Sequence, residues 1–461
     1  MICIHDNITP QRDKTLTWMK KRGVMKKEFS FEQLTKSLRG VIQSFPDKRT
    51  GKNVNYTMED AALGAFSVFF TQCPSFLAHQ KSMEEAKGKS NAQTIFGMEK
   101  IPTDNHIRDL LDPVAPETVY PVFDDAHQIL GDSGHIESFR VFNGDLLIPL
   151  DATWYFASKK IHCDNCSSIK HKDGSITYYH SALTPVIVAP GRSEVIALAP
   201  EFILPQDGHE KQDCENAAAK RWIQNHGEKY SQMGVSILGD DLYSNQPICK
   251  ALLDKGFNFI LVCKPDSHKT LYEWVELLEE GVDRHTITVT RWNGKIWEVY
   301  TYRYANGVPL RDSDDALMVN WIELTITTKE GEVLYKNSFI TNHKITDKNG
   351  ENIVLCGRTR WKVENENNNT LKTKGYNLEH NYGHGQEHLS SLLATFIILA
   401  FLFHTVLDFM DGKYRLLRKK LSARKTFFND IRSLTRYICF DSWDHLMRFM
   451  IEGLELTYDS G

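Results

Sequence analysis

Three acidic residues stand where an acid could hold a catalytic metal ion. Asp151 lies in an apolar run, and Asp240 ends a second, shorter one. Glu364 follows Arg360 in a segment that we expect to be helical. If one sheet brings the three acids together, their hard oxygens could bind two Mg²⁺ (or Mn²⁺) ions about 4 Å apart, an arrangement suited to phosphoryl transfer. Spacing alone is weak support, because the chain has 59 acidic residues.

Cys163 and Cys166 form a second candidate metal site. Two cysteines at this spacing can supply half of a tetrahedral Zn²⁺ site. The chain has no second C-x2-C pair, so His180, His171 or a distant cysteine such as Cys214 would have to complete it. A structural zinc and a pair of reduced thiols in a turn are both open interpretations.

Three further histidines, His380, His384 and His388, are spaced by four residues. On a helix they would form a metal-binding stripe, but Gly383 and Gly385 favour a loop. We therefore expect polar contacts from these histidines rather than metal binding.

The elements that would position these residues follow from hydrophobic patterning. Residues 140–267 contain three predicted strands, with a turn at Pro190-Gly191, followed by alternating helices and strands. This order indicates an α/β domain around a single sheet. Helical patterns return over 354–410, where Glu364 lies.

Residues 268–353 are dominated by predicted strands. Asn293-Gly294 separates two alternating runs and predicts a hairpin with a two-residue type I′ turn. Trp292 and Trp297 flank that turn. We interpret 268–353 as an all-β insertion in the α/β domain.

Both ends of the chain are predicted to be helical. Residues 1–135 combine short helical patterns with a basic stretch from Arg12 to Lys27. The basic run 413–425 has leucines at helical spacing and predicts one amphipathic helix. Its basic face is either solvated or in contact with phosphates.

Composition narrows the class of protein. The 461 residues suggest about three domains, and the net charge of −4 excludes a uniformly basic nucleic-acid binder. The nine scattered cysteines indicate a reducing compartment, and the N-terminus has no signal-peptide pattern. Residues 389–410 approach the length of a membrane span, but polar residues interrupt them, so we expect a buried core helix. No P-loop or Rossmann glycine pattern occurs.

Three runs of sequence resemble one known family. The runs 150–163, 237–245 and 358–385 are similar to insertion-sequence transposases of the DDE type. The catalytic domain of that family is ribonuclease-H-like. One group carries a β-rich insertion between the second Asp and the Glu, and a signature Tyr-x2-Arg-x3-Glu-x6-Lys around the Glu. The resemblance covers roughly residues 140–410.

The resemblance implies that Asp151, Asp240 and Glu364 are the catalytic metal ligands. Asp241 is the alternative to Asp240, and Glu366 is the alternative to Glu364. Arg360 matches the signature Arg and would hold a DNA phosphate beside Glu364. An ordinary i, i+4 ion pair on a surface helix is the other interpretation.

Two signature positions depart from the family. Gly357 stands where the Tyr is expected, and the Lys is displaced to Lys372 or Lys374. Residues 211–222 also have wording similar to these proteins, for which we expect packing and phosphate contacts rather than catalysis. An aromatic residue of the β-insertion can stack on an unpaired base, worth about 1–3 kcal/mol. Trp292 and Trp297 are candidates, although cross-strand packing is the simpler interpretation.

The sequence thus predicts a DNA transposase that binds the terminal inverted repeats of its element through residues 1–135, assisted by 411–461. Metal-dependent cleavage and strand transfer would occur in a ribonuclease-H-like domain made of 140–267 and 354–410. The expected partners are double-stranded DNA, as transposon end and target, and a second copy of the chain in a synaptic dimer. We expect it in the cytoplasm with the nucleoid, not in a membrane. The alternative is a catalytically inactive DNA-binding relic.

Overall fold

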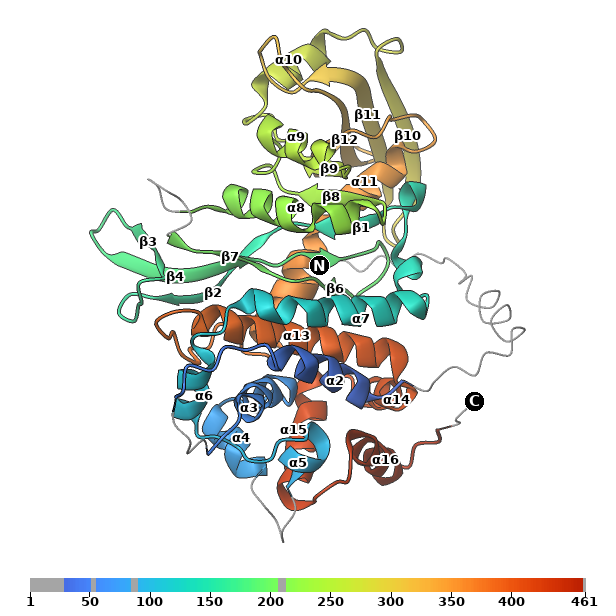
Figure 1. Cartoon of the computed structure of the whole chain (residues 1–461). Coiled ribbons are helices and arrows are strands. Elements are labelled where there is room, and N and C mark those ends of the chain that lie inside the picture. Colours follow the sequence, from blue (N-terminus) through green and yellow to red (C-terminus); the bar gives the residue numbers. More distant parts are fainter. Residues whose placement is uncertain (1–28, 51–54, 84–89, 206–212, 459–461) are drawn as a thin grey trace.

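The computed structural model describes residues 29–50, 55–83, 90–205 and 213–458, and it shows a mixed α/β protein (Figure 1). The large sheet extends into a β-rich end of the molecule, which also carries α9 and α10 (Figure 1). Helices form the opposite end (Figure 1). The mixed sheet with flanking helices agrees with the sequence prediction. The basic stretch from Arg12 to Lys27 lies outside the described residues.

The largest sheet has seven strands in the order β1-β8-β9-β13-β12-β11-β10. Its first three strands, β1, β8 and β9, pair in parallel and are short and apolar, as expected for strands buried on both faces. The other four continue the sheet in antiparallel pairs. The bounds are β1 Leu146–Pro149, β8 Val235–Gly239, β9 Asn258–Val262, β10 Arg284–Trp292, β11 Trp297–Pro309, β12 Met318–Thr328 and β13 Val333–Thr341.

The predicted hairpin at Asn293-Gly294 is present, but its predicted two-residue turn is wrong. Trp292 pairs with Trp297, so four residues connect the strands. Gly294 has a φ of +95°, whereas Asn293 is not in the left-handed region. The Asn293 side chain instead accepts hydrogen bonds from the backbone N–H groups of Lys295 and Ile296, which stabilises the longer turn.

The prediction of a single sheet is also wrong, because the first apolar run divides at Asp151. β1 joins the large sheet before that residue, and the next strand enters a second sheet after it. The second sheet pairs β2 with β4, and β4 with β3 and β7. A third pair is β5 with β6. The bounds are β2 Ala152–Ser158, β3 Ser167–Lys170, β4 Ile176–Leu183, β5 Val186–Ile187, β6 Ile196–Ala197 and β7 Glu201–Ile203.

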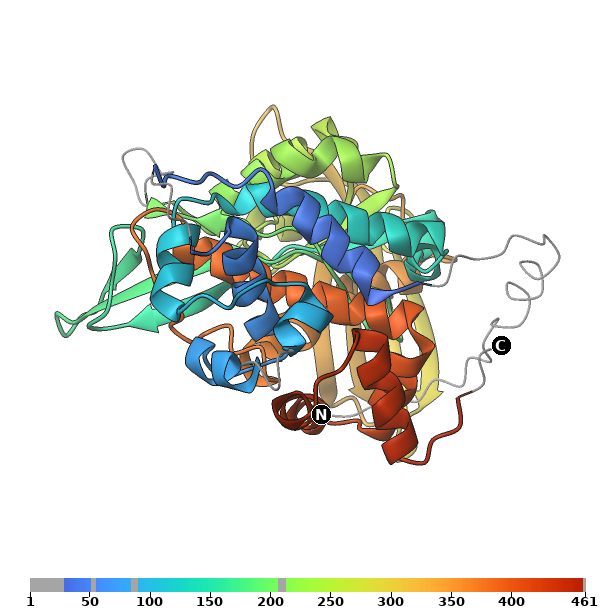
Figure 2. The same ribbon diagram turned by 60° about the horizontal axis from the view of Figure 1, so that its bottom comes forward.

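Helices from both ends of the chain pack together into one bundle (Figures 1 and 2). α13 lies at its centre and contacts α3, α6, α7 and α14. The N-terminal helices are α2 Phe31–Ile42, α3 Met58–Phe70, α4 Phe76–Met83, α5 Asn91–Phe96, α6 Asp104–Leu111 and α7 Tyr120–Asp132. The C-terminal helices are α13 Leu389–Met410, α14 Gly412–Lys420, α15 Arg424–Tyr437 and α16 Trp443–Gly453.

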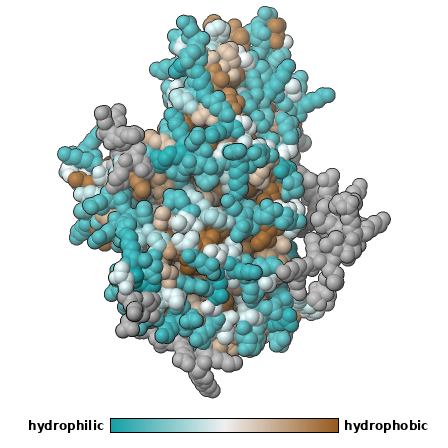
Figure 3. Space-filling model, viewed as in Figure 1, coloured by the Kyte–Doolittle hydropathy of each residue, from teal (hydrophilic) through white to brown (hydrophobic). Residues whose placement is uncertain are grey.

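α13 is the one helix in the described part of the chain that is long and apolar enough to cross a membrane. Every residue from Ser391 to Leu407 is buried in the bundle. Thr395 and Thr405 donate hydrogen bonds to backbone carbonyls of their own helix, which satisfies their hydroxyl groups in this apolar setting. The helix is thus packed as a core helix, and the face in Figure 3 is mostly hydrophilic.

The predicted single basic helix over 413–425 is two helices, α14 and α15, that meet around Leu421. Several of its basic side chains are bound to other groups of the protein. Lys413 pairs with Asp444 at 2.7 Å, and Arg418 donates to the backbone carbonyls of Leu421 and Ser422. Others are exposed: Arg415, Lys419, Lys420 and Lys425.

The remaining helices surround the sheets. They are α8 Glu215–Ser231, α9 Gln246–Asp254, α10 Lys269–Leu277, α11 Gly350–Arg358 and α12 Asn369–Thr373. Between α11 and α12 the chain forms a 3₁₀ turn, Thr359–Trp361, and a π-helical turn, Val363–Asn368. Short 3₁₀ turns also occur at Pro116–Val119, Ile136–Phe139 and Phe142–Gly144.

Candidate metal centres

Asp151 and Asp240 lie at the same edge of the large sheet. β1 and β8 are parallel, with Pro149 opposite Leu238, and each aspartate follows its strand residue by two positions. The backbone N–H of Leu150 donates to the carbonyl of Leu238 at 2.9 Å, which extends the pairing toward the aspartates. The carboxyl ends of neighbouring parallel strands are the usual place for ligands in such sheets.

Glu364 reaches this edge through Arg360. The Arg360 guanidinium lies 2.7 Å from Glu364 Oε1 and 3.8 Å from Asp151 Oδ1, so one cation contacts both acids. Asp151 and Arg360 have side chains that are about one-fifth exposed, whereas Glu364 is half exposed. The Arg360–Glu364 ion pair, which is the alternative interpretation of this spacing, is present, and Arg360 also approaches Asp151.

Burial raises the pKa of Asp151 to about 7, and the nearby carboxylates of Glu215, Glu364 and Asp240 add to the rise. Arg360 acts in the opposite direction. Arg360 pairs with Glu364 and Asp151, and Asp151 also lies within the electrostatic influence of Glu215 and Asp240. We call these four carboxyl groups the acid cluster: Asp151, Glu215, Asp240 and Glu364. The excess of oxygen donors and negative charge fits a divalent cation.

The structure separates the predicted acids from their alternatives. Asp241 accepts hydrogen bonds from the Lys264 backbone N–H at 2.6 Å and from the Ser267 hydroxyl at 2.5 Å, so it is committed to the loop after β9. Glu366 lies near Lys362 instead. Burial lowers the pKa of Lys362 overall, and the negative charge of Glu366 opposes part of that effect. Asp240 and Glu364 are therefore the members of each pair that belong to the acid cluster.

Sequence reasoning missed two residues that touch this site. Glu215 begins α8, and its Oε1 accepts a hydrogen bond from the backbone N–H of Ala152, next to Asp151. Asn368 donates from Nδ2 to Asp151 Oδ2 at 3.1 Å. Glu215 lies in the segment 211–222, whose sequence is similar to that of transposases, and Asn368 lies in the asparagine-rich segment 364–369. Neither pattern indicates which residue the side chain contacts.

The other three predicted DNA-contacting residues, Lys372, Trp292 and Trp297, have partners of their own. Lys372 forms an ion pair with Glu379 at 2.9 Å. Trp292 and Trp297 are about half exposed at the hairpin end of β10 and β11, with ring centroids 5.6 Å apart. The Lys329 ammonium group lies 5.0 Å from the Trp297 ring centroid. The two indoles thus pair across the strands while keeping exposed faces.

The packing around Gly357 leaves no room for a side chain. A Cβ atom there would lie 2.7 Å from the Phe339 ring and 2.9 Å from the Ile260 side chain. α11 therefore approaches β9 and β13 too closely for any larger residue without rearrangement.

Cys163, Cys166, His180 and His384 form a second group, which we call the Cys2His2 cluster. Their ligand atoms all lie within 4.8 Å of one another. His180 Nε2 is 3.4 Å from each cysteine Sγ and 3.1 Å from His384 Nδ1. Two sulfurs and two imidazole nitrogens at these separations are a potential tetrahedral metal site.

Three separate elements supply these four side chains. The cysteines lie in a turn after β2, where the Cys166 backbone N–H donates to the Cys163 carbonyl. His180 lies on β4, and His384 lies in the loop before α13. The predicted zinc residues Cys163, Cys166 and His180 are therefore together. The fourth donor is His384, for which the sequence indicated polar contacts rather than metal binding.

The other proposed ligands have different roles. His171 Nε2 is 2.8 Å from the Thr177 hydroxyl, and Cys214 is exposed before the first turn of α8. The segment around His384 is a loop, as its glycines predict, so His380 and His388 do not share a helical face with it.

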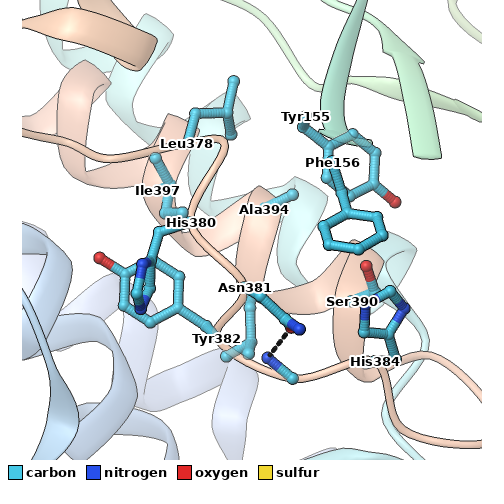
Figure 4. A pocket seen from close by; sticks show the side chains of 12 residues that line it. Tyr155, Phe156, Leu378, His380, Asn381, Tyr382, His384, Ser390, Ala394 and Ile397 are labelled. Carbon is cyan, nitrogen blue, oxygen red and sulfur yellow. Dashed lines mark hydrogen bonds between the residues drawn. The ribbon is translucent and has the colours of Figure 1, made fainter. Parts of the chain in front are cut away.

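The surroundings hold the Cys2His2 cluster in place. The His384 ring meets the edge of Phe156 at 4.4 Å between centroids, beside a cavity of about 20 Å³ that Tyr155 and Ser390 also line (Figure 4). A hydrogen bond from Cys166 lowers the pKa of the Cys163 thiol, and His180 lowers it further. The same hydrogen bond raises the pKa of Cys166. One thiolate is thus already favoured, which suits metal binding.

No protein-family model matches the chain, and no curated protein is significantly similar to it. The fold and its two clusters define a mixed α/β protein with an acidic site at the carboxyl edge of parallel strands. A separate group of sulfur and nitrogen donors lies near it in the chain.

Proposed function

We propose that this protein is a DNA transposase of the DDE type. Asp151, Asp240 and Glu364 would hold two Mg²⁺ (or Mn²⁺) ions in a ribonuclease-H-like domain. The observation that carries the proposal is that Arg360 joins Glu364 to Asp151 at the sheet edge where Asp240 follows the neighbouring strand β8. The same residues are the ones that match the transposase motifs in three separate segments of the sequence.

The divalent ions would supply an activated water, or an activated DNA 3′-hydroxyl, and stabilise the oxygen that leaves phosphorus. The residues of the chain do the rest. Asp151 is held by Asn368, which fixes the direction of its carboxylate. Arg360 neutralises two acids in the metal-free protein, and it is placed to hold a DNA phosphate when cations take over that role.

DNA would contact several surfaces around this edge. The exposed cations of α14 and α15 and the helices of residues 1–135 would bind the element's terminal repeats. β10–β13 would be the β-rich insertion, since they lie between Asp240 and Glu364 in the chain. They extend the large sheet through the pairing of β13 with β9, and because residues 268–353 include α10, they are not all-β, contrary to the sequence prediction. Trp292 and Trp297 at its hairpin would stack on an unpaired base, and Lys372 would contact phosphate. The working assembly would be a synaptic dimer in the cytoplasm, on the nucleoid.

We further propose that the Cys2His2 cluster binds a structural Zn²⁺ ion. Cys163, Cys166, His180 and His384 would supply the usual two sulfur and two nitrogen ligands. The ion would tie the turn after β2 to the loop before α13. Asn165 already joins these segments by donating to the Glu387 carbonyl at 2.8 Å. Metal content of the purified protein, before and after a chelator, tests this directly.

The test of the main function is cleavage of linear DNA that carries the element's own ends. Asp151→Ala, Asp240→Ala and Glu364→Ala should each abolish Mg²⁺-dependent cleavage while end binding persists. Glu366→Ala is the matched control, because it removes an acid from the same turn, and it should cleave like the unaltered protein. End binding without cleavage in any divalent metal would instead identify a DNA-binding relic. Absence of end binding would contradict the transposase itself.

A further inference from the structure

Glu215 connects the chain segments that carry the two aspartates. One oxygen, Oε1, accepts the backbone N–H of Ala152 at 3.1 Å and the phenol O–H of Tyr243 at 2.6 Å. Ala152 directly follows Asp151, and Tyr243 belongs to the turn that Asp240 begins. A single carboxylate oxygen therefore fastens both segments to the start of α8.

Tyr243 is a rigid partner in this arrangement. Its side chain is 1% exposed, and a Cβ atom on Gly239 would lie 2.9 Å from the Tyr243 Cβ. The ring is thus packed against the end of β8. Its phenol cannot move away from Glu215 without disturbing the strand that leads to Asp240.

The start of α8 is anchored as well. Arg221, on the second turn of α8, donates to Asp213 at 2.8 Å and to Glu201 at 2.8 Å. It also donates to the backbone carbonyl of Phe202 on β7 at 2.9 Å. These bonds fix the first turns of α8 against the second sheet, so Glu215 is presented from a firm base.

We propose that Glu215 is a positioning residue that sets the separation of Asp151 and Asp240 through this shared oxygen. The inference rests on the proposed function, because it takes those aspartates to be the metal ligands. Groups that orient ligands in this way commonly change metal affinity by about 10–100-fold when removed. The role needs a hydrogen-bond acceptor and not a charge, which separates it from direct metal ligation.

Mn²⁺ binding measured by electron paramagnetic resonance tests the proposal without DNA. Glu215→Ala should raise the half-saturating Mn²⁺ concentration by about tenfold. Glu215→Gln should stay close to the unaltered protein, because its amide oxygen can accept both hydrogen bonds. Tyr243→Phe removes one of the two bonds and should fall between them. Glu228→Ala, on the exposed face of α8, is the matched control.

Several outcomes would overturn the proposal. Equal weakening in Glu215→Gln and Glu215→Ala would show that the carboxylate is a metal ligand. Unchanged binding in Glu215→Ala or in Tyr243→Phe would show that the shared oxygen positions nothing, and Tyr243→Phe gives this answer even if Glu215→Ala fails to fold. Absence of Mn²⁺ binding by the unaltered protein would also overturn it. Normal Mn²⁺ binding in a protein that cleaves no ends would reject the transposase and leave the positioning role intact.

Discussion

The acid cluster and the Cys2His2 cluster both take residues from the chain around β2 and around α12, but they arrange their charges and donor atoms differently. Asp151 precedes β2 and the cysteines follow it, while Glu364 and His384 lie on either side of α12. In the acid cluster, Arg360 pairs with Asp151 and Glu364, while burial and three nearby carboxylates raise the pKa of Asp151. In the Cys2His2 cluster, the donors already contact one another within 4.8 Å. The first cluster is joined by one guanidinium and by charge, whereas the second brings four donor atoms into one compact group.

The largest expected effect concerns the Cys2His2 cluster. Cys163→Ser should abolish the bound Zn²⁺ and lower the Tm by about 5–10 °C, since each lost kcal/mol lowers the Tm of a domain of 150–250 residues by about 2–4 °C. Zinc content and calorimetry measure both effects. Cys214→Ser, outside the cluster, should change neither. If the variant lost its zinc but kept the same Tm, the ion would not stabilise the fold, and the proposed difference between the two clusters would be wrong.

For the acid cluster we expect the free energy of unfolding to depend on pH, because charging the buried Asp151 carboxyl group is unfavourable. The pKa of Asp151 is about 7 in the folded protein, above its ordinary value of 3.8, so between these values the folded state binds the proton more tightly than the unfolded chain. The free energy of unfolding of the metal-free protein should therefore fall by up to a few kcal/mol as the pH rises from about 4 to 7. Asp151→Asn should remove that fall. Denaturant unfolding in a chelator at several pH values measures it, and equal slopes in both proteins would contradict it.

A smaller effect tests the packing behind the acid cluster. Gly357→Tyr would introduce the tyrosine of the signature that this segment resembles, but it should destabilise the protein by about 1–3 kcal/mol, because its side chain would collide with Phe339. Gly40→Ala is the matched control, since a Cβ atom there meets nothing within 4 Å in α2. That control should be neutral or stabilise by about 0.5–1 kcal/mol. Denaturant midpoints compare the two, and a stable tyrosine variant would show that α11 can move.

The smallest expected effect lies outside both clusters. Trp297→Ala should weaken binding of DNA with unpaired bases by about 1–2 kcal/mol and leave fully paired DNA unaffected. Fluorescence anisotropy with the two DNA forms measures the difference. Equal losses with both forms would assign Trp297 to packing against Trp292.

Local sequence patterns predicted much of what is local in this protein. The short apolar runs identified β8 and β9, because strands buried on both faces need continuous apolar side chains. The run around Asp151 was predicted as one strand and is two, β1 and β2. The spacing of Arg360 and Glu364 left an ion pair open as the alternative to a phosphate contact, since residues four apart meet on a helical turn. The C-x2-C spacing predicted two adjacent sulfurs. The acid triad came from the resemblance, and its catalytic role is still a prediction.

Tertiary structure decided which distant residues meet. It divided the first apolar run between two sheets at Asp151 and directed Asp241 away from Asp240 toward Lys264. It also brought His384 to the cysteines and Glu215 to Ala152. These contacts join segments far apart in the chain, so they depend on strand order and helix packing. A single sequence records periodicity along the chain, but it does not record which of many polar side chains will face one another across the fold.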